Sequence, residues 1–241
     1  MPASSLAMFL FSCAVGALIQ TTTGFGFGIV CMAIFPYILP SFGQSVAISS
    51  LCAATMSSVV ALRCRKHVNL KMILPLFAGY SLAVAWSIRY SKTQSEGLLI
   101  RLLGVVLILV SVYFIFFSNT LRIRPNFFNG FCMGIFCGIG AGMFGIGGPP
   151  AVIYLMSATQ DKDEYRACSL AYFAIGSWYA SGVRMFNGII NGQTVRWWML
   201  ALAALVVGVW AGNRLFYKIN AKVLKRLVYG FMAISGLTML F

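Results

Sequence analysis

Long runs of apolar residues, separated by short polar loops, cover almost the whole chain. A helix needs about 20 mostly apolar residues to cross a bilayer, and charge-poor stretches at or below this length recur from end to end. They span 4–19, 25–39, 44–62, 72–88 and 98–117 in the first half, and 127–143, 150–159, 165–183, 195–212 and 223–241 in the second. The pattern predicts an all-α, polytopic membrane protein with about five hydrophobic segments in each half.

Two glycine-rich motifs interrupt this pattern at matching places. The first, 23–28, reads Thr-Gly-Phe-Gly-Phe-Gly, and the second, 144–150, reads Phe-Gly-Ile-Gly-Gly-Pro-Pro. The same 121 residues separate Gly24 from Gly145 and Gly26 from Gly147, in a chain of 241. This spacing predicts two transmembrane repeats, 1–121 and 122–241, packed together as one integrated membrane domain.

The segment that follows each motif is short. Residues 150–159 would form only about 15 Å of helix at 1.5 Å per residue, which is half a bilayer. We therefore expect the segments around each motif to be broken or re-entrant helices whose tips meet inside the membrane. Backbone groups freed by such breaks cannot be satisfied by lipid, so the breaks should line a protein-enclosed cavity.

The charged residues favour an inverted arrangement of the repeats. The chain is 60% hydrophobic and 9% charged, with a net charge of +14 carried mainly by loops. If each glycine motif returns the chain to the side from which it came, most Lys and Arg residues fall on one side, as expected for cytoplasmic loops. Five segments per half then place the second repeat upside down, with both termini outside. Basic residues dispersed among such loops also argue against nucleic acid as a partner.

The motifs carry donors that suit a small anion. Helices that start after a break present free backbone amides and a partial positive charge, and glycine allows a ligand to approach the backbone closely. Prolines tolerate the first helical turn because they have no amide to leave unpaired. The predicted substrate-binding residues are Gln20, Thr21, Thr22, Thr23, Gly24, Phe25, Gly26, Phe27, Gly28, Ser49, Gly145, Ile146, Gly147, Gly148, Pro149 and Ser169.

Other polar and small residues have two interpretations each. Hydroxyl residues in 44–62 and 165–183 could line a pathway or pack helices; they include Ser50, Tyr172 and Ser177. The glycines at four-residue steps from 130 to 142 are expected to pack helices closely. Arg63 and Arg184 are expected to snorkel at helix ends, and Arg166 to pair locally with Asp163 and Glu164.

No catalytic, metal or cofactor site is expected. The seven cysteines show no paired spacing, and the four acids and one histidine lie in loops. Without a carboxylate inside the membrane, transport would be driven by a proton carried on the substrate or by the membrane potential. A non-catalytic membrane scaffold, or a membrane enzyme, remains the alternative function.

The two motifs resemble those of the TauE/SafE family of sulfite exporters. The resemblance rests on the first glycine motif, on the Gly-Ile-Gly-Gly-Pro-Pro sequence of the second motif, and on the stretches 47–51 and 166–170. It implies a transporter, of the exporter type, for sulfite, sulfonates or related organosulfur and carboxylate anions in the bacterial cytoplasmic (inner) membrane. The lipid bilayer and a small anionic substrate are its expected partners, and its oligomeric state is open.

Overall fold

Helices make up the regular structure in the part of the chain that the computed structural model describes, residues 3–116, 123–216 and 221–240. The predicted boundary at 121–122 lies outside these residues. The α-helices are α1 (Ala3–Thr23), α2 (Phe27–Met32), α3 (Phe35–Ile38), α4 (Phe42–Arg63), α5 (Leu70–Ser91), α6 (Glu96–Phe116), α7 (Phe127–Phe144), α8 (Gly148–Ala158), α9 (Lys162–Phe186), α10 (Gly192–Leu215) and α11 (Ala221–Thr238). A short 3-10 helix, Arg65–His67, precedes α5.

The helix ends follow from local sequence. Five helices begin after a residue whose side chain accepts a backbone N–H of the first turn, which satisfies an otherwise unpaired donor. These residues are Ser41, Asn69, Asn126, Asp161 and Asn191. The glycine motifs end helices instead: Gly24 and Gly26 have φ of 86° and 112°, and Gly145 has φ of 71°. Side chains other than glycine rarely adopt this left-handed backbone, so the breaks depend on glycine.

Six described helices are long and apolar enough to cross a membrane: α1, α4, α5, α6, α7 and α10. The prediction of a multi-pass, all-α membrane protein is therefore confirmed. The segments after the two motifs are short, as expected, because 25–39 is divided between α2 and α3, and α8 has 11 residues. The long helix α9 carries charged residues at both ends and lies within the bundle.

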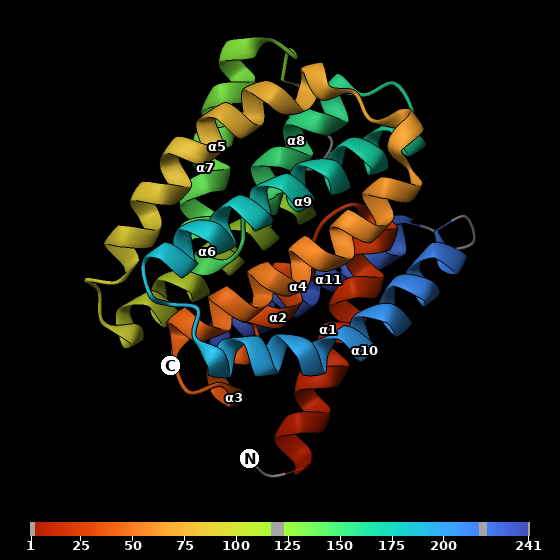
Figure 1. Cartoon of the computed structure of the whole chain (residues 1–241). Coiled ribbons are helices and arrows are strands. Elements are labelled where there is room, and N and C mark those ends of the chain that lie inside the picture. Colours follow the sequence, from red (N-terminus) through yellow and green to blue (C-terminus); the bar gives the residue numbers. More distant parts are fainter. Residues whose placement is uncertain (1–2, 117–122, 217–220, 241) are drawn as a thin grey trace.

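The central helices form a continuous series of contacts. In the order α7, α5, α9, α4, α10 and α1, each helix packs on the next. Figure 1 shows α4 and α9 between the two flanking pairs, α5 with α7 and α1 with α10. The middle of the molecule is therefore built by one helix from each half of the chain.

Small residues bring the flanking helices into close contact. A Cβ at Gly134 of α7 would collide with the carbonyl oxygen of Leu76 in α5, and a Cβ at Gly138 would lie 2.6 Å from the carbonyl oxygen of Tyr80. The prediction that the glycines from 130 to 142 pack helices is confirmed. On the other flank, Gly208 of α10 lies in the same way against the carbonyl of Ala14 in α1. Such contacts replace the hydrophobic driving force that helices lack within lipid.

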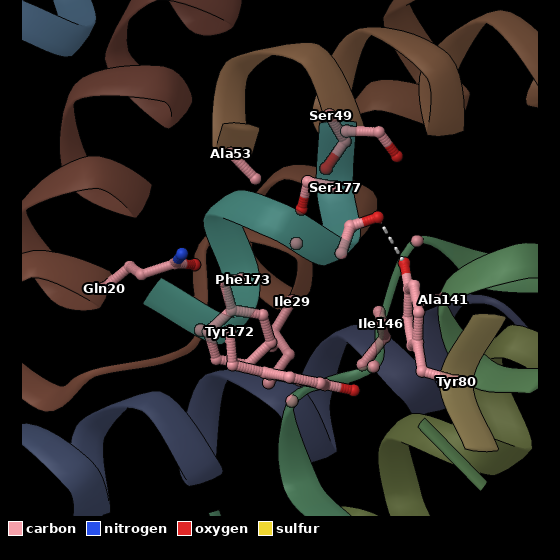
Figure 2. Close-up of a pocket in the computed structure, with 17 residues that line it drawn as sticks. Gln20, Ile29, Ser49, Ala53, Tyr80, Ala141, Ile146, Tyr172, Phe173 and Ser177 are labelled. Atoms are coloured by element: carbon pink, nitrogen blue, oxygen red, sulfur yellow. Dashed lines mark hydrogen bonds between the residues drawn. The ribbon is translucent and has the colours of Figure 1, made fainter. Parts of the chain in front are cut away.

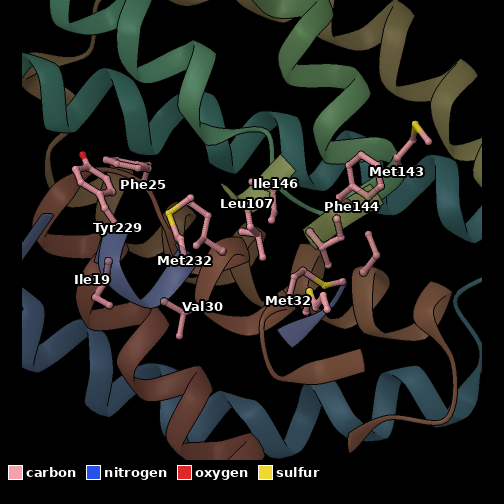
Figure 3. Close-up of a cluster of buried hydrophobic side chains, with 14 of the residues drawn as sticks. Ile19, Phe25, Val30, Met32, Leu107, Met143, Phe144, Ile146, Tyr229 and Met232 are labelled. Atoms are coloured by element: carbon pink, nitrogen blue, oxygen red, sulfur yellow. The ribbon is translucent and has the colours of Figure 1, made fainter. Parts of the chain in front are cut away.

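The pair α6 and α11 covers the two glycine breaks with apolar side chains. Figure 3 shows Phe25 and Ile146, one from each break, in a cluster with Leu107 of α6 and Met232 of α11. Phe25 stacks on Phe114 with ring centroids 5.7 Å apart. The breaks are therefore buried inside protein.

Candidate functional site

The two glycine breaks meet inside the molecule. A Cβ on Gly28, at the start of α2, would collide with the carbonyl oxygen of Gly145, where α7 ends. A Cβ at Gly140 would likewise collide with the carbonyl of Ile146. The contact between Gly28 and Gly145 joins two points that are distant in the sequence, and it brings the ends of α1 and α7 to a common centre.

Gln20 holds the first break in place. Its Oε1 accepts the backbone N–H of Phe27 at 3.0 Å, and its Nε2 donates to Oγ of Ser57 in α4 at 2.8 Å. The side chain therefore caps α2 and ties α1 to α4. The N–H of Phe27, which the sequence offered as a donor for an anion, is occupied by this bond.

A cavity of about 40 Å³ lies between the breaks (Figure 2). A water molecule needs about 10 to 15 Å³ measured in this way, so the space suits a few waters or one small oxyanion. Its walls come from both breaks and from α4, α5, α7 and α9. They are formed by Gln20, Gly26, Gly28, Ile29, Ser49, Ser50, Ala53, Tyr80, Ala141, Gly145, Ile146, Gly147, Gly148, Tyr172, Phe173, Gly176 and Ser177. We refer to this space as the central cavity.

Several polar groups of this cavity have unused hydrogen-bonding capacity. Tyr172 is 1% exposed, and its hydroxyl lies beside the thiol of Cys137, a weak acceptor, with no oxygen or nitrogen partner among the described residues. The backbone N–H groups of Gly28, Ile29 and Gly147 likewise take no acceptor from the described part of the chain. In contrast, the Tyr80 hydroxyl donates to the carbonyl of Gly176 at 3.0 Å, the bond drawn in Figure 2. Buried polar groups are normally paired, so these donors indicate a place for a polar solute.

The structure brings half of the predicted site residues together and places the others elsewhere. Those that line the central cavity are Gln20, Gly26, Gly28, Ser49, Gly145, Ile146, Gly147 and Gly148. Those outside its walls are Thr21, Thr22, Thr23, Gly24, Phe25, Phe27, Pro149 and Ser169.

Six of the eight residues outside the cavity have identifiable other roles. The hydroxyls of Thr22 and Thr23 donate to carbonyls of their own helix, at Leu18 and Ile19, which is a common use of threonine in membrane helices. Phe25 belongs to the apolar cluster under α6 and α11. The remaining residues are packed as follows: Phe27 fills a second core cluster, Gly24 lies against Tyr165 and Ser169, and Pro149 is buried in the first turn of α8.

Other residues of the cavity fall in the hydroxyl-rich segments. Of the hydroxyl residues proposed on sequence to line a pathway, four line the cavity, namely Ser49, Ser50, Tyr172 and Ser177. Six lie outside its walls: Ser45, Thr55, Ser57, Ser58, Ser169 and Tyr179. Tyr80 and Phe173 were not singled out. Their only sequence signal is an aromatic ring inside an apolar helix, which core packing explains equally well.

The expectation that Arg184 snorkels to the surface is wrong. Arg184 is 1% exposed, and its guanidinium donates to Ser50 Oγ at 2.9 Å and to the carbonyls of Ala141 and Gly142 at 2.7 and 3.1 Å. These carbonyls belong to the last turn of α7, the negative end of the helix dipole, which stabilises the buried cation. Arg63, in contrast, is exposed at the end of α4.

Arg166 makes an equivalent contact at the first break. It is 5% exposed, its Nε donates to the carbonyl of Thr21 at 2.8 Å, and its Nη2 donates to Asn213. Thr21 and Gly142 are separated by the same 121 residues as the two glycine motifs. Each buried arginine of α9 therefore binds the helix end that precedes one break.

Two larger spaces flank the central cavity, each beside one of these arginines. The Arg184 vestibule, about 320 Å³, is lined among others by Gln44, Lys92, Gln94, Gly142 and Asn191. The Arg166 vestibule, about 370 Å³, is lined by Thr22, Thr23, Met156, Thr159, Gln160, Asp161, Lys162, Tyr165, Arg166 and Phe216. The arginines lie near opposite ends of α9, about 27 Å apart along the helix, and Tyr172 and Ser177 of the cavity lie between them.

Comparison with known proteins agrees with this architecture. The sequence model of the family described as Sulfite exporter TauE/SafE matches residues 8–239. The chain is 21% identical over 229 residues to a protein of Cupriavidus necator named "Probable sulfite/organosulfonate exporter TauE", an alignment that covers 93% of this chain and 90% of that protein. No solved structure matches the chain. Because the family match extends over both glycine breaks and nearly the full length, the chain belongs to the TauE/SafE family of sulfite exporters.

Proposed function

We propose that this protein exports small oxyanions, sulfite or organosulfonates, across the bacterial cytoplasmic membrane by way of the central cavity. The observation that carries the proposal is the space between the two breaks, whose walls include backbone N–H groups that take no acceptor from the described part of the chain. The family to which the chain belongs, and the printed name of its relative from Cupriavidus necator, support the same substrate class.

The chemistry of the cavity favours an anion over a cation. The described residues that line it include no carboxylate, whereas they present amide and hydroxyl donors from both halves. Fixed donors of this kind can replace the hydration shell of an oxyanion without reorganising. A volume of about 40 Å³ suits sulfite directly, and a longer organosulfonate requires the walls to separate.

We also propose that the halves are inverted repeats. In this scheme each helix of the first half corresponds to one of the second: α1 to α7, α4 to α9, α5 to α10 and α6 to α11. Exchanging the corresponding helices turns the contact of α1 with α10 into the contact of α7 with α5, and both contacts are present. The pairs α4 with α9 and α6 with α11 are unchanged by the exchange. This two-fold pattern, together with the one-sided distribution of basic loops, supports an axis through the central cavity in the membrane plane.

The described walls of the cavity contain no carboxylate that could carry a proton, so we propose that the energy for transport comes from the substrate's own proton or from the membrane potential. A weak acid such as bisulfite can carry its own proton, and an anion leaving a cell is also driven by the inside-negative potential, worth about 2.3 kcal/mol per charge per 100 mV. Either source of energy is compatible with a cavity whose described walls contain no carboxylate.

The deciding experiment is transport by purified protein in liposomes. Labelled sulfite, sulfoacetate and sulfate are supplied with and without a pH gradient, and with and without a potassium diffusion potential. We expect saturable flux of sulfite or sulfoacetate above that of protein-free liposomes. A scaffold would move none of these anions, and an enzyme would convert them chemically; either result overturns the proposal.

A further inference from the structure

Arg184 stands in the wall between the Arg184 vestibule and the central cavity. Its partners Ser50 and Ala141 line the central cavity, whereas Gly142 and Arg184 itself line the vestibule. The guanidinium and its hydrogen bonds therefore lie on the direct line between the two spaces.

The charge of Arg184 is balanced only in part. In the described part of the chain its hydrogen bonds go to one hydroxyl and two carbonyls. Glu96 is the acid that lines the vestibule, and its Oε1 accepts the N–H of Phe42 at the start of α4, at 3.2 Å. A buried charge without a carboxylate partner is costly, by several kcal/mol in real proteins, so an anion beside the guanidinium would be strongly favoured.

The vestibule offers further groups that suit an oxyanion. Lys92 lies on its wall, with its Nζ fixed on the carbonyl of Asn187 at 2.8 Å. Gln44 also lines the vestibule, and its Oε1 is buried without a partner among the described residues. That oxygen is an acceptor, so Gln44 can donate to an oxyanion only through its amide NH2 group. Arginine forms paired hydrogen bonds to planar oxyanions more readily than lysine does, because its N–H groups are held in a fixed fork.

We propose that Arg184 is an anion-binding gate, where a sulfite or sulfonate group binds between the vestibule and the central cavity. The oxyanion replaces the carbonyls of Ala141 and Gly142 as acceptor for the guanidinium, which releases the end of α7 next to the second break. The proposal rests on the proposed function, and it assigns a second anion site separate from the central cavity. The contact of Arg166 with Thr21 gives the first break the same arrangement.

Flux measurements on Arg184 variants provide the first test. We expect Arg184→Gln to lower sulfoacetate flux at least tenfold, and Arg184→Lys to keep part of it because the charge remains. Arg63→Gln is the matched control, since Arg63 occupies the corresponding chain position, 121 residues earlier, and is exposed. Flux of Arg184→Gln equal to that of the control overturns the gate while the proposed function stands. Absence of flux in the unaltered protein overturns the proposed function instead.

A binding measurement covers the case in which Arg184→Gln fails to fold. Gln94→Cys places a thiol in the vestibule, and its rate of labelling by N-ethylmaleimide is followed with and without sulfoacetate. We expect sulfoacetate to slow labelling at least threefold when Arg184 is present, and to slow it distinctly less in the folded Gln94→Cys, Arg184→Lys double variant at the same concentration, because lysine keeps the charge without the paired donors. Equal protection in both, or protection in neither, contradicts the gate.

Discussion

The Cα of Gly28 lies so close to the carbonyl oxygen of Gly145 that no side chain fits between them. This contact connects the break in the first half to the break in the second. It also fixes the width of the central cavity, because both residues line it. Any change in the distance between the two breaks must therefore alter the cavity.

Gly28→Ala is expected to reduce transport sharply while the protein still inserts. Its methyl group would collide with backbone that cannot rotate away, so the breaks must separate. A displacement of about 1 Å at a binding site can cost about 100-fold in rate. Flux in liposomes measures the effect, with Gly182→Ala as control, because a Cβ at Gly182 meets nothing within 4 Å. Equal flux in both variants would show that the contact is incidental.

Gln20→Leu is expected to destabilise the protein and to lower its flux. The substitution leaves the N–H of Phe27 and the hydroxyl of Ser57 without their partner. Hydrogen bonds between membrane helices contribute about 0.6 to 2 kcal/mol each. The midpoint of thermal unfolding in detergent should fall by several degrees, whereas Gln193→Leu, at an exposed position of α10, should leave it unchanged. An unchanged midpoint in Gln20→Leu would mean that other contacts hold the break.

Tyr172→Phe and Tyr80→Phe are expected to have opposite effects. Among the described residues the Tyr172 hydroxyl has only the weak acceptor Cys137 beside it, so its removal should change stability little and raise the KM for the anion about 2- to 10-fold, as expected for the loss of one hydrogen bond. The Tyr80 hydroxyl is bound to the carbonyl of Gly176, so its removal should lower the unfolding midpoint. If Tyr172→Phe lowers stability and leaves KM unchanged, the hydroxyl serves packing and not the substrate.

The hydrophobic pattern was sufficient to predict the helices and the breaks, because each depends on local sequence. Apolar runs define the long helices, and Gly145 followed by Pro149 and Pro150 prevents α7 from continuing. The same reasoning did not separate the residues of 20–28 that line the central cavity from those that lie outside its walls. Thr22 and Thr23 look like donors in sequence, but only the fold shows that their hydroxyls are used by the carbonyls of α1.

For Arg184 the sequence led to the opposite error, because a residue expected at the surface is buried. Nothing near it in sequence distinguishes an arginine that ends a helix at the surface from one that turns inward. Its burial depends on Ser50 of α4 and on the carbonyls that end α7, which are remote in the chain. The corresponding Arg63 is exposed. Long-range contacts of this kind decide which cations belong to a site.

The inverted arrangement predicts that the two vestibules open on opposite sides of the membrane. Gln94→Cys in the Arg184 vestibule should react with a membrane-impermeant maleimide added outside intact cells, and Gln160→Cys in the Arg166 vestibule should react only after permeabilisation. Cys64 and Cys132 are partly exposed and are replaced by serine in both variants. If each glycine break instead completed a single crossing of the membrane, both positions would lie on one side and would react together. Such a result would contradict the inverted repeat. It would also contradict a transport route that leads from the Arg166 vestibule through the central cavity to the Arg184 vestibule.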